Sequence, residues 1–255
     1  MPDVWFRLVC LFSLGLTCIA PALLGCAALT PADTPMVTAQ LELAEAYLQD
    51  DKPRRSLQEL QHIENPGSLS ARYQFDLGRT YMALEQWEQA ETHFQQVVQQ
   101  DPQHAKAWNR LGQVYMAQDN VSQAENAFQT ALDTLTYLNP ERAALHLAQL
   151  YRQTGEMEKA MNMAQKALRE NERFLPAHLF LNELLVAQGR IDKALTRLQE
   201  AESIFPDQPQ ILLALAENNL RLGNTVYART WFERILTVAP ESEAAAMARD
   251  YLGLF

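Results

Sequence analysis

LGQVY, residues 111–115, decides the fold because altered copies of it recur along the chain. The related stretches are LAEAY at 43–47, LGRTY at 77–81, LAQLY at 147–151, LNELL at 181–185 and LAENN at 215–219. Successive copies start 34, 34, 36, 34 and 34 residues apart. A fixed period of this length indicates a chain built from stacked structural repeats.

A 34-residue period with Leu-Gly or Leu-Ala followed by Tyr is typical of the tetratricopeptide repeat, a pair of packed helices. Its small residues let the two helices of a unit approach closely. They are Ala44, Gly78, Gly112, Ala148 and Ala216 at the eighth position of a unit, and Ala90, Ala124, Ala160, Ala194 and Ala228 at the twentieth. The sequence therefore predicts an all-α, right-handed superhelix of six tetratricopeptide repeats, in which Gly112 faces Ala124.

The period also places the unit boundaries. We expect the six units at 37–70, 71–104, 105–138, 141–174, 175–208 and 209–242, with 139–140 as an insertion. Residues 243–255 form a capping helix after the last unit. The fifth and sixth units are the least regular, because Asn182 and Asn219 depart from the repeat pattern.

The N-terminus has the layout of a lipoprotein signal peptide. A short head precedes an apolar run at 8–24, and the four residues 23–26 read LLGC. Cleavage of residues 1–25 would leave Cys26 at the new N-terminus as the acceptor of the lipid, and 26–36 as a tether. Ala27 is typical of lipoproteins passed to the outer membrane, so we expect a lipid-anchored protein on its periplasmic face. An uncleaved anchor remains an alternative, since the run from residue 8 to 29 is almost long enough to span a bilayer. Plain secretion is a second alternative, with Cys26 a bystander at an ordinary cleavage site.

The charge of the chain excludes one class of partner. The formal net charge is −10, and no cluster of basic residues interrupts the sequence. Such a chain is a poor ligand for the phosphates of nucleic acids or for anionic lipid headgroups. Contact with a membrane is therefore expected only through the N-terminal lipid.

No catalytic or metal-binding motif is present in the sequence. The chain lacks a glycine-rich phosphate loop, an HExxH pair, a CxxC pair and a nucleophile elbow. The histidines, His62, His93, His104, His146 and His178, fall at unrelated repeat positions. We therefore expect neither an enzyme nor a cofactor, metal or small-molecule substrate, but a scaffold that binds other proteins.

The binding surface of such a superhelix is its concave groove, lined by the first helix of each unit at positions 2, 5, 9 and 12. These positions and their neighbours give a basic and amide-rich strip that suits a peptide or helix with acidic and apolar side chains. The alternative for any one residue is that it is simply a partly exposed part of the stack. The predicted groove residues are Arg72, Phe75, Arg79, Met82, Lys106, Asn109, Arg110, Gln113, Met116, Arg142, Leu145 and Gln149.

Residues 131–168, ALDTLTYLNPERAALHLAQLYRQTGEMEKAMNMAQKAL, resemble the pilotin (PilF/PilW/Tgl-like) family of type IV pilus biogenesis lipoproteins. That family also has a lengthened turn after its third repeat, here Thr134 to Arg142 with Pro140-Glu141-Arg142 at its end. The resemblance covers Cys26 to about Pro240. It implies a protein that helps the pilus secretin, the outer-membrane ring of the pilus, to reach the membrane and multimerise. The alternative is a scaffold lipoprotein of outer-membrane protein assembly or exopolysaccharide export.

Overall fold

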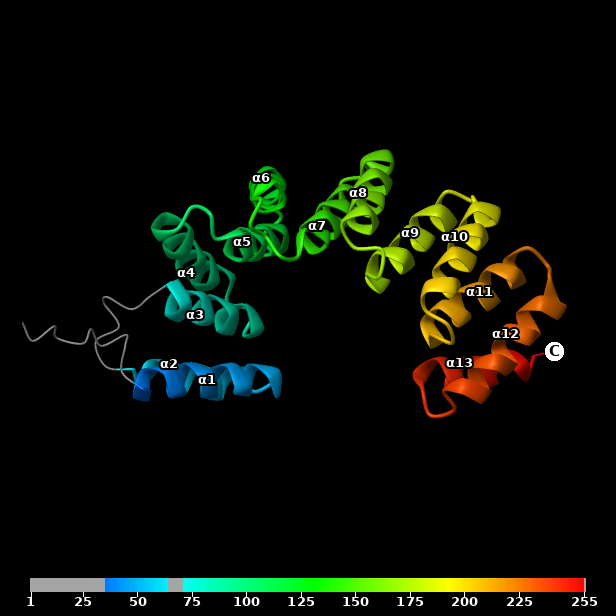
Figure 1. Ribbon diagram of the computed structural model, residues 1–255, viewed down its shortest axis with the longest axis horizontal. Helices are drawn as coiled ribbons and strands as arrows, with labels where there is room; N and C mark the ends of the chain where they lie inside the picture. The colour runs from blue at the N-terminus through cyan, green and yellow to red at the C-terminus, as the bar shows by residue number, and fades with distance from the viewer. Residues whose placement is uncertain (1–34, 64–70, 255) are drawn as a thin grey trace, which may run out of the picture.

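The computed structural model describes residues 35–63 and 71–254, and every regular element in these two ranges is an α-helix (Figure 1). This confirms the all-α solenoid expected from the repeat. The helices follow one another in pairs and a final single helix: α1 (Pro35–Gln49) and α2 (Pro53–Gln61), α3 (Ala71–Ala83) and α4 (Trp87–Gln100), α5 (Ala105–Ala117) and α6 (Val121–Asp133), α7 (Pro140–Gln153) and α8 (Met157–Glu170), α9 (Leu175–Ala187) and α10 (Ile191–Ile204), α11 (Pro209–Arg221) and α12 (Thr225–Val238), then α13 (Glu243–Leu252).

The predicted signal peptide, 1–25, and Cys26, the predicted acceptor of the lipid, lie outside the described residues. So do residues 27–34 of the predicted tether, residues 64–70 and Phe255. The last two residues of the predicted tether, Pro35 and Met36, belong to α1. Within the described ranges, no helix is both long and apolar enough to cross a membrane.

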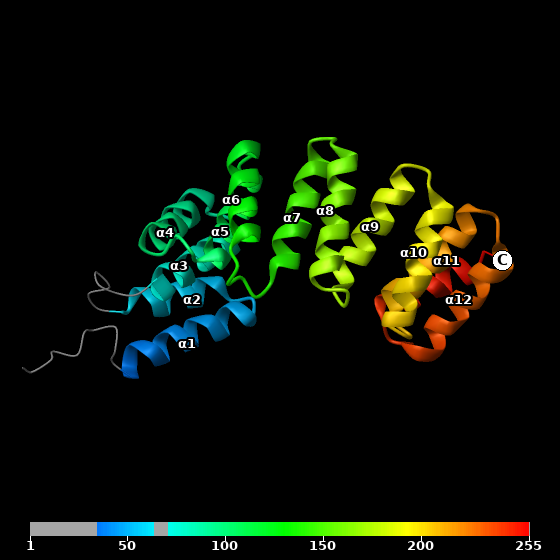
Figure 2. The ribbon, with the colours of Figure 1, turned by 45° about the horizontal axis from the view of Figure 1, so that its top comes forward.

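The pairs are arranged along an arch. Figure 1 shows α1 at one end and α13 at the other, and the view turned by 45° in Figure 2 keeps the same order. Each pair packs against the pairs before and after it, so the apolar face that one pair cannot cover alone is buried by its neighbours. The inner side of the arch is therefore continuous from α1 to α13.

Close packing within a pair depends on a glycine that faces an aromatic ring. The ring that closes on Gly112 of α5 is Phe128 of α6, and Phe94 of α4 lies in the same way against Gly78 of α3. Both phenylalanine side chains are fully buried. The missing Cβ of Gly112 therefore makes room for the ring of Phe128, and the expected approach of Gly112 to Ala124 stays a prediction.

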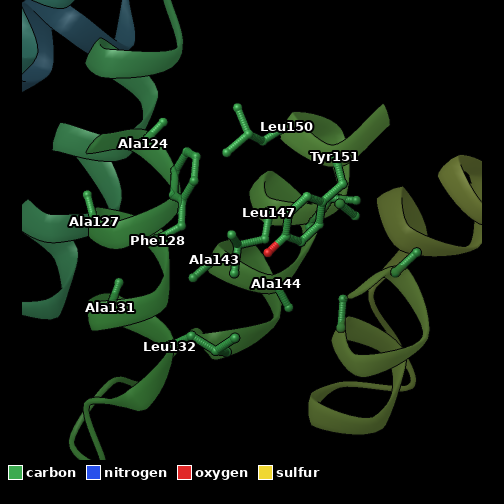
Figure 3. Close-up of a cluster of buried hydrophobic side chains, with 14 of the residues drawn as sticks. Ala124, Ala127, Phe128, Ala131, Leu132, Ala143, Ala144, Leu147, Leu150 and Tyr151 are labelled. Carbon is green, nitrogen blue, oxygen red and sulfur yellow. The ribbon is translucent and has the colours of Figure 1, made fainter. Parts of the chain in front are cut away.

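The longer turn after the third pair does not interrupt the core. Figure 3 shows Phe128 of α6 and Leu147 and Leu150 of α7 pointing toward one another across the joint between the two pairs. All three side chains are at most 1% exposed. At the C-terminal end, Ala245 and Ala248 of α13 pack on the last pair, so this helix caps the stack.

Each pair turns back on itself through one residue with a positive φ. The φ values lie between 55° and 82° at Asp51, Glu85, Asp119, Gly155, Gly189 and Gly223. These six residues occupy the same repeat position, so the tight turn between the helices is a property of the repeat. The first three pairs place an acidic residue, and not glycine, in this conformation.

Candidate partner-binding pocket

One pocket brings together eight of the twelve groove residues predicted from the sequence. Its volume is about 400 Å³, and its walls come from α1, α3, α5, α7 and the turn between α6 and α7. The eight are Arg72, Phe75, Arg79, Lys106, Asn109, Arg110, Gln113 and Arg142.

The four other predicted residues do not line this pocket. Leu145, at the fifth position of the fourth unit, lies in the core with 6% of its surface exposed. Met82 and Met116, one helical turn farther along their helices, pack half-buried against the same core. Gln149 is half-buried at the ninth position of the fourth unit. Along α3, α5 and α7 the lining therefore ends before the twelfth repeat position, which Met82 and Met116 occupy.

Two of the predicted cations are already paired with carboxylates. Arg79 Nη1 lies 3.2 Å from Glu45 Oε1 and 3.4 Å from Asp76 Oδ1. Arg72 Nε lies 3.8 Å from Asp76 Oδ2. The Arg79–Glu45 pair joins α3 to α1, whereas both pairs with Asp76 lie within α3. Arg72 and Arg79 thus already have carboxylates beside them that compete with those of a partner.

The carboxylate between these cations is in an unfavourable setting. Asp76 is 3% exposed, and its Oδ2 accepts no hydrogen bond from any described residue. Burial raises the pKa of Asp76 to about 6, and the nearby Glu45 adds to the rise while Arg79 and Arg72 oppose it. A buried carboxylate oxygen that accepts no hydrogen bond costs stability, and the ion pair with Arg72 at 3.8 Å offsets only part of that cost.

The other three cations have no carboxylate partner. Among the described residues, no ion pair involves Lys106, Arg110 or Arg142. Burial lowers the pKa of Arg110, and the positive charges of Arg79 and Arg142 lower it further. Like charges that repel across a partly buried pocket are stabilised by an anion from outside.

A chain of hydrogen bonds fixes the position of Arg110. Its Nη1 donates to Gln113 Oε1 at 2.9 Å, and Gln113 Nε2 lies 2.8 Å from His146 Nε2. His146 Nδ1 lies 2.9 Å from Asn109 Oδ1. These contacts require a neutral imidazole whose proton sits on Nδ1, since Nε2 must accept from the amide. The pKa of His146 agrees, because burial, with Arg110 and Arg142, lowers it to about 4.

The prediction from sequence missed five lining residues: Glu45, Asp76, Tyr137, Asn139 and His146. Asp76 and His146 occupy the sixth repeat position, like Arg110, so this position also faces the pocket. Glu45 occupies the ninth position of the first unit, and this register alone predicts its pairing with Arg79. Tyr137 and Asn139 belong to the turn, whose path the repeat does not specify.

Polar side chains of the later units satisfy one another across the repeats. Arg152 Nη1 lies 2.6 Å from Glu183 Oε2, and Asn218 Nδ2 donates to Asn182 Oδ1 at 2.6 Å. The described residues also contain no group of three His, Cys, Asp or Glu side chains that could hold a metal ion. The unpaired cations of the groove therefore gather in the third and fourth units.

Two models of known protein families match this chain. A family model described as the C-terminal domain of cilia and flagella-associated protein 70 matches residues 26–207, and a tetratricopeptide repeat model matches 185–250. The chain belongs to this tetratricopeptide repeat family. No curated protein matches the chain.

Several solved structures share the family's fold. PilW, described as a widely conserved type IV pilus biogenesis factor, is 19% identical with a TM-score of 0.68, over 84% of this chain and 98% of PilW. PilF of Pseudomonas aeruginosa is 16% identical with a TM-score of 0.66, over 86% of this chain and 98% of PilF. MamA is 19% identical with a TM-score of 0.54, over 65% of this chain and 95% of MamA. At these identities the likeness shows a shared fold.

Proposed function

We propose that this chain is a non-enzymatic scaffold whose pocket holds an acidic segment of another protein. The observation that carries this proposal is the cluster of Lys106, Arg110 and Arg142, which line one pocket and pair with no carboxylate of the described chain. A carboxylate that enters the pocket relieves their mutual repulsion and restores the solvation that Arg110 loses on burial. Tetratricopeptide repeat proteins commonly bind partners on the concave surface of the superhelix.

We further propose that the scaffold serves type IV pilus assembly. Its lipid-anchored form would sit on the periplasmic face of the outer membrane, where it would help the pilus secretin to multimerise. Support comes from the LLGC stretch, the lengthened turn at Thr134–Arg142 and the fold shared with almost the whole of PilW and PilF. The acidic segment would then belong to the secretin or to another envelope assembly protein.

Reversal of two pocket charges tests the role in cells. Lys106→Glu combined with Arg142→Glu replaces attraction by repulsion, and both side chains are exposed, so the fold is expected to survive. The expected result is a loss of secretin multimers and of surface pili in host cells. Arg169→Glu with Lys193→Glu is the matched control, because it changes the net charge equally at exposed positions of α8 and α10. Normal multimers at normal protein level in the pocket variant would contradict the proposal.

The lipid anchor has a separate test. Cys26→Ser removes the thiol that would accept the lipid, and no cysteine follows it in the chain. Labelling of cells with palmitate is expected to mark the parent and not the variant. Equal labelling of the two proteins would rule out acylation at Cys26 without affecting the proposal for the pocket.

A further inference from the structure

The turn between α6 and α7 exposes two large apolar side chains. Leu135 has 101% of its surface exposed and Leu138 has 82%. Single exposed leucines are common on soluble proteins, but two of them in one short turn at the edge of a charged pocket are not explained by the fold. They contribute nothing to the core.

The turn itself is well anchored. Thr134 Oγ1 donates to the carbonyl of Thr130 at 2.8 Å, and the backbone N–H of Tyr137 donates to the carbonyl of Thr134 at 3.0 Å. The side chain of Tyr137 is 8% exposed and lines the pocket. The chain therefore buries the tyrosine and holds the two leucines in solvent on either side of it.

The turn lies on the inner side of the arch. In Figure 1 the loop from α6 to α7 faces the space between the two ends of the molecule, and α1 and α13 reach beyond it. Tyr137 and Asn139 of the turn share the pocket with Lys106, Arg110 and Arg142. The turn that carries the two leucines thus adjoins the pocket of the unpaired cations on the inner side of the arch.

We propose that Leu135 and Leu138 form the apolar half of the binding surface. The occupant is a segment of a partner protein in which acidic side chains enter the cation pocket and a neighbouring apolar side chain packs on the two leucines. This inference rests on the proposed function, since the acidic part of the occupant follows from the charges of the pocket. The new element is the turn, which makes the surface select an acidic and apolar segment over an equally acidic polar one.

Two labelled peptides of equal charge test the selection. One is composed of glutamate and leucine, and the other has serine in place of leucine. The parent protein is expected to bind the glutamate–leucine peptide roughly tenfold more tightly, because apolar surface is buried on the turn. Leu135→Ser combined with Leu138→Ser is expected to abolish this preference and to leave the binding of the glutamate–serine peptide unchanged. The matched control is Leu222→Ser with Val226→Ser, which removes exposed apolar side chains at 39% and 76% exposure from the α11–α12 end.

The outcomes separate this inference from the proposed function. If the leucine variant keeps the preference for the glutamate–leucine peptide, the turn is not the apolar contact. If the parent binds neither peptide, or if Lys106→Glu with Arg142→Glu leaves both peptides bound, the acidic pocket fails as well. Binding of the parent to phosphatidylglycerol vesicles that the leucine variant loses would assign the turn to lipid. Self-association lost in the leucine variant would assign the turn to a second copy of the chain. Either result would overturn the inference.

Discussion

Gly112 of α5 lies so close to the ring of Phe128 of α6 that a Cβ at residue 112 would come within 2.5 Å of the Cε1 atom. The same relationship recurs one unit earlier, where a Cβ at Gly78 would lie 2.7 Å from Cε1 of Phe94. The two rings are fully buried and cannot move aside into solvent. Glycine is therefore required by the packing at these positions and not by the backbone.

Replacement of Gly112 by alanine should destabilise the protein. Alanine favours a helix over glycine by about 1 kcal/mol, but the added Cβ overpacks the ring of Phe128, which costs about 1–3 kcal/mol. We expect a net loss of stability in urea unfolding and faster amide exchange in α5 and α6. Gly253→Ala is the control, because a Cβ at that residue would meet its nearest atoms at 3.5 Å. Unchanged stability in Gly112→Ala would show that residue 112 does not pack this closely on the ring of Phe128.

Replacement of Glu85, in the turn of the second unit, by glycine should stabilise the folded protein. Glu85 has a φ of 58°, whereas the equivalent residue in the last three units is glycine. A residue with a Cβ loses roughly 1–2 kcal/mol in this conformation, and the greater freedom of glycine in the unfolded chain offsets part of that. Glu85→Gly is expected to raise the free energy of unfolding by about 0.5–1 kcal/mol. Glu88→Gly in α4 should lower it by about 1 kcal/mol, so a loss in both variants would contradict the argument.

The repeat predicts the helices and most of the pocket for one physical reason. Small and large residues recur at fixed positions because every pair packs against its neighbours in the same way, and the positions that face inward recur with them. Arg72, Lys106 and Arg142 were found from this register alone. Of the sixth-position residues only Arg110 was predicted, and Asp76 and His146 were missed, because side chains of a helix lean toward its N-terminus and so cover a shifted surface.

The rest of the pocket depends on contacts that the register does not contain. Leu145 is buried in the core where α7 packs on α5, α6 and α8, and the repeat register alone does not predict this burial. The neutral state of His146 follows from its burial beside two arginines, which come from different helices. The exposure of Leu135 depends on the path of a turn that occurs once in the chain and belongs to no repeat position.

Asp76 should make the stability depend on pH. Its pKa in the folded protein, about 6, lies above the ordinary value of 3.8, so the folded state holds the proton more tightly than the unfolded state. This contribution to stability is present below the ordinary pKa and is lost as the pH rises through about 6. Asp76→Asn cannot titrate. The stability of the parent relative to this variant should therefore increase as the pH is lowered from 7 to 4.

Urea unfolding of the parent and Asp76→Asn at a series of pH values measures this difference. His146 contributes in the opposite direction, because its lowered pKa makes the folded state lose stability as the pH falls from 6.5 toward 4. That contribution is common to both proteins and cancels when they are compared. A difference that stays constant with pH would show that Asp76 does not titrate in this window.

Gln113 should matter for binding although it carries no charge. Its amide accepts from Arg110 and donates to His146, so Gln113→Leu leaves every charge of the pocket in place while it frees the guanidinium to move. A hydrogen bond to a charged group contributes about 1.5–3 kcal/mol, and a hydrogen bond from Arg110 to water replaces part of this in the variant. We therefore expect the glutamate–leucine peptide to bind Gln113→Leu roughly tenfold more weakly. Gln149→Leu is the matched control, since this glutamine has the same repeat position in the next unit and does not line the pocket.

Nitrogen NMR of the His146 ring gives an independent readout of the hydrogen bond from Gln113. Nε2 should be unprotonated in the parent, and its signal should shift in Gln113→Leu but not in Gln149→Leu. Equal binding by the two variants would mean that the charge of Arg110 suffices and that its orientation by Gln113 plays no part.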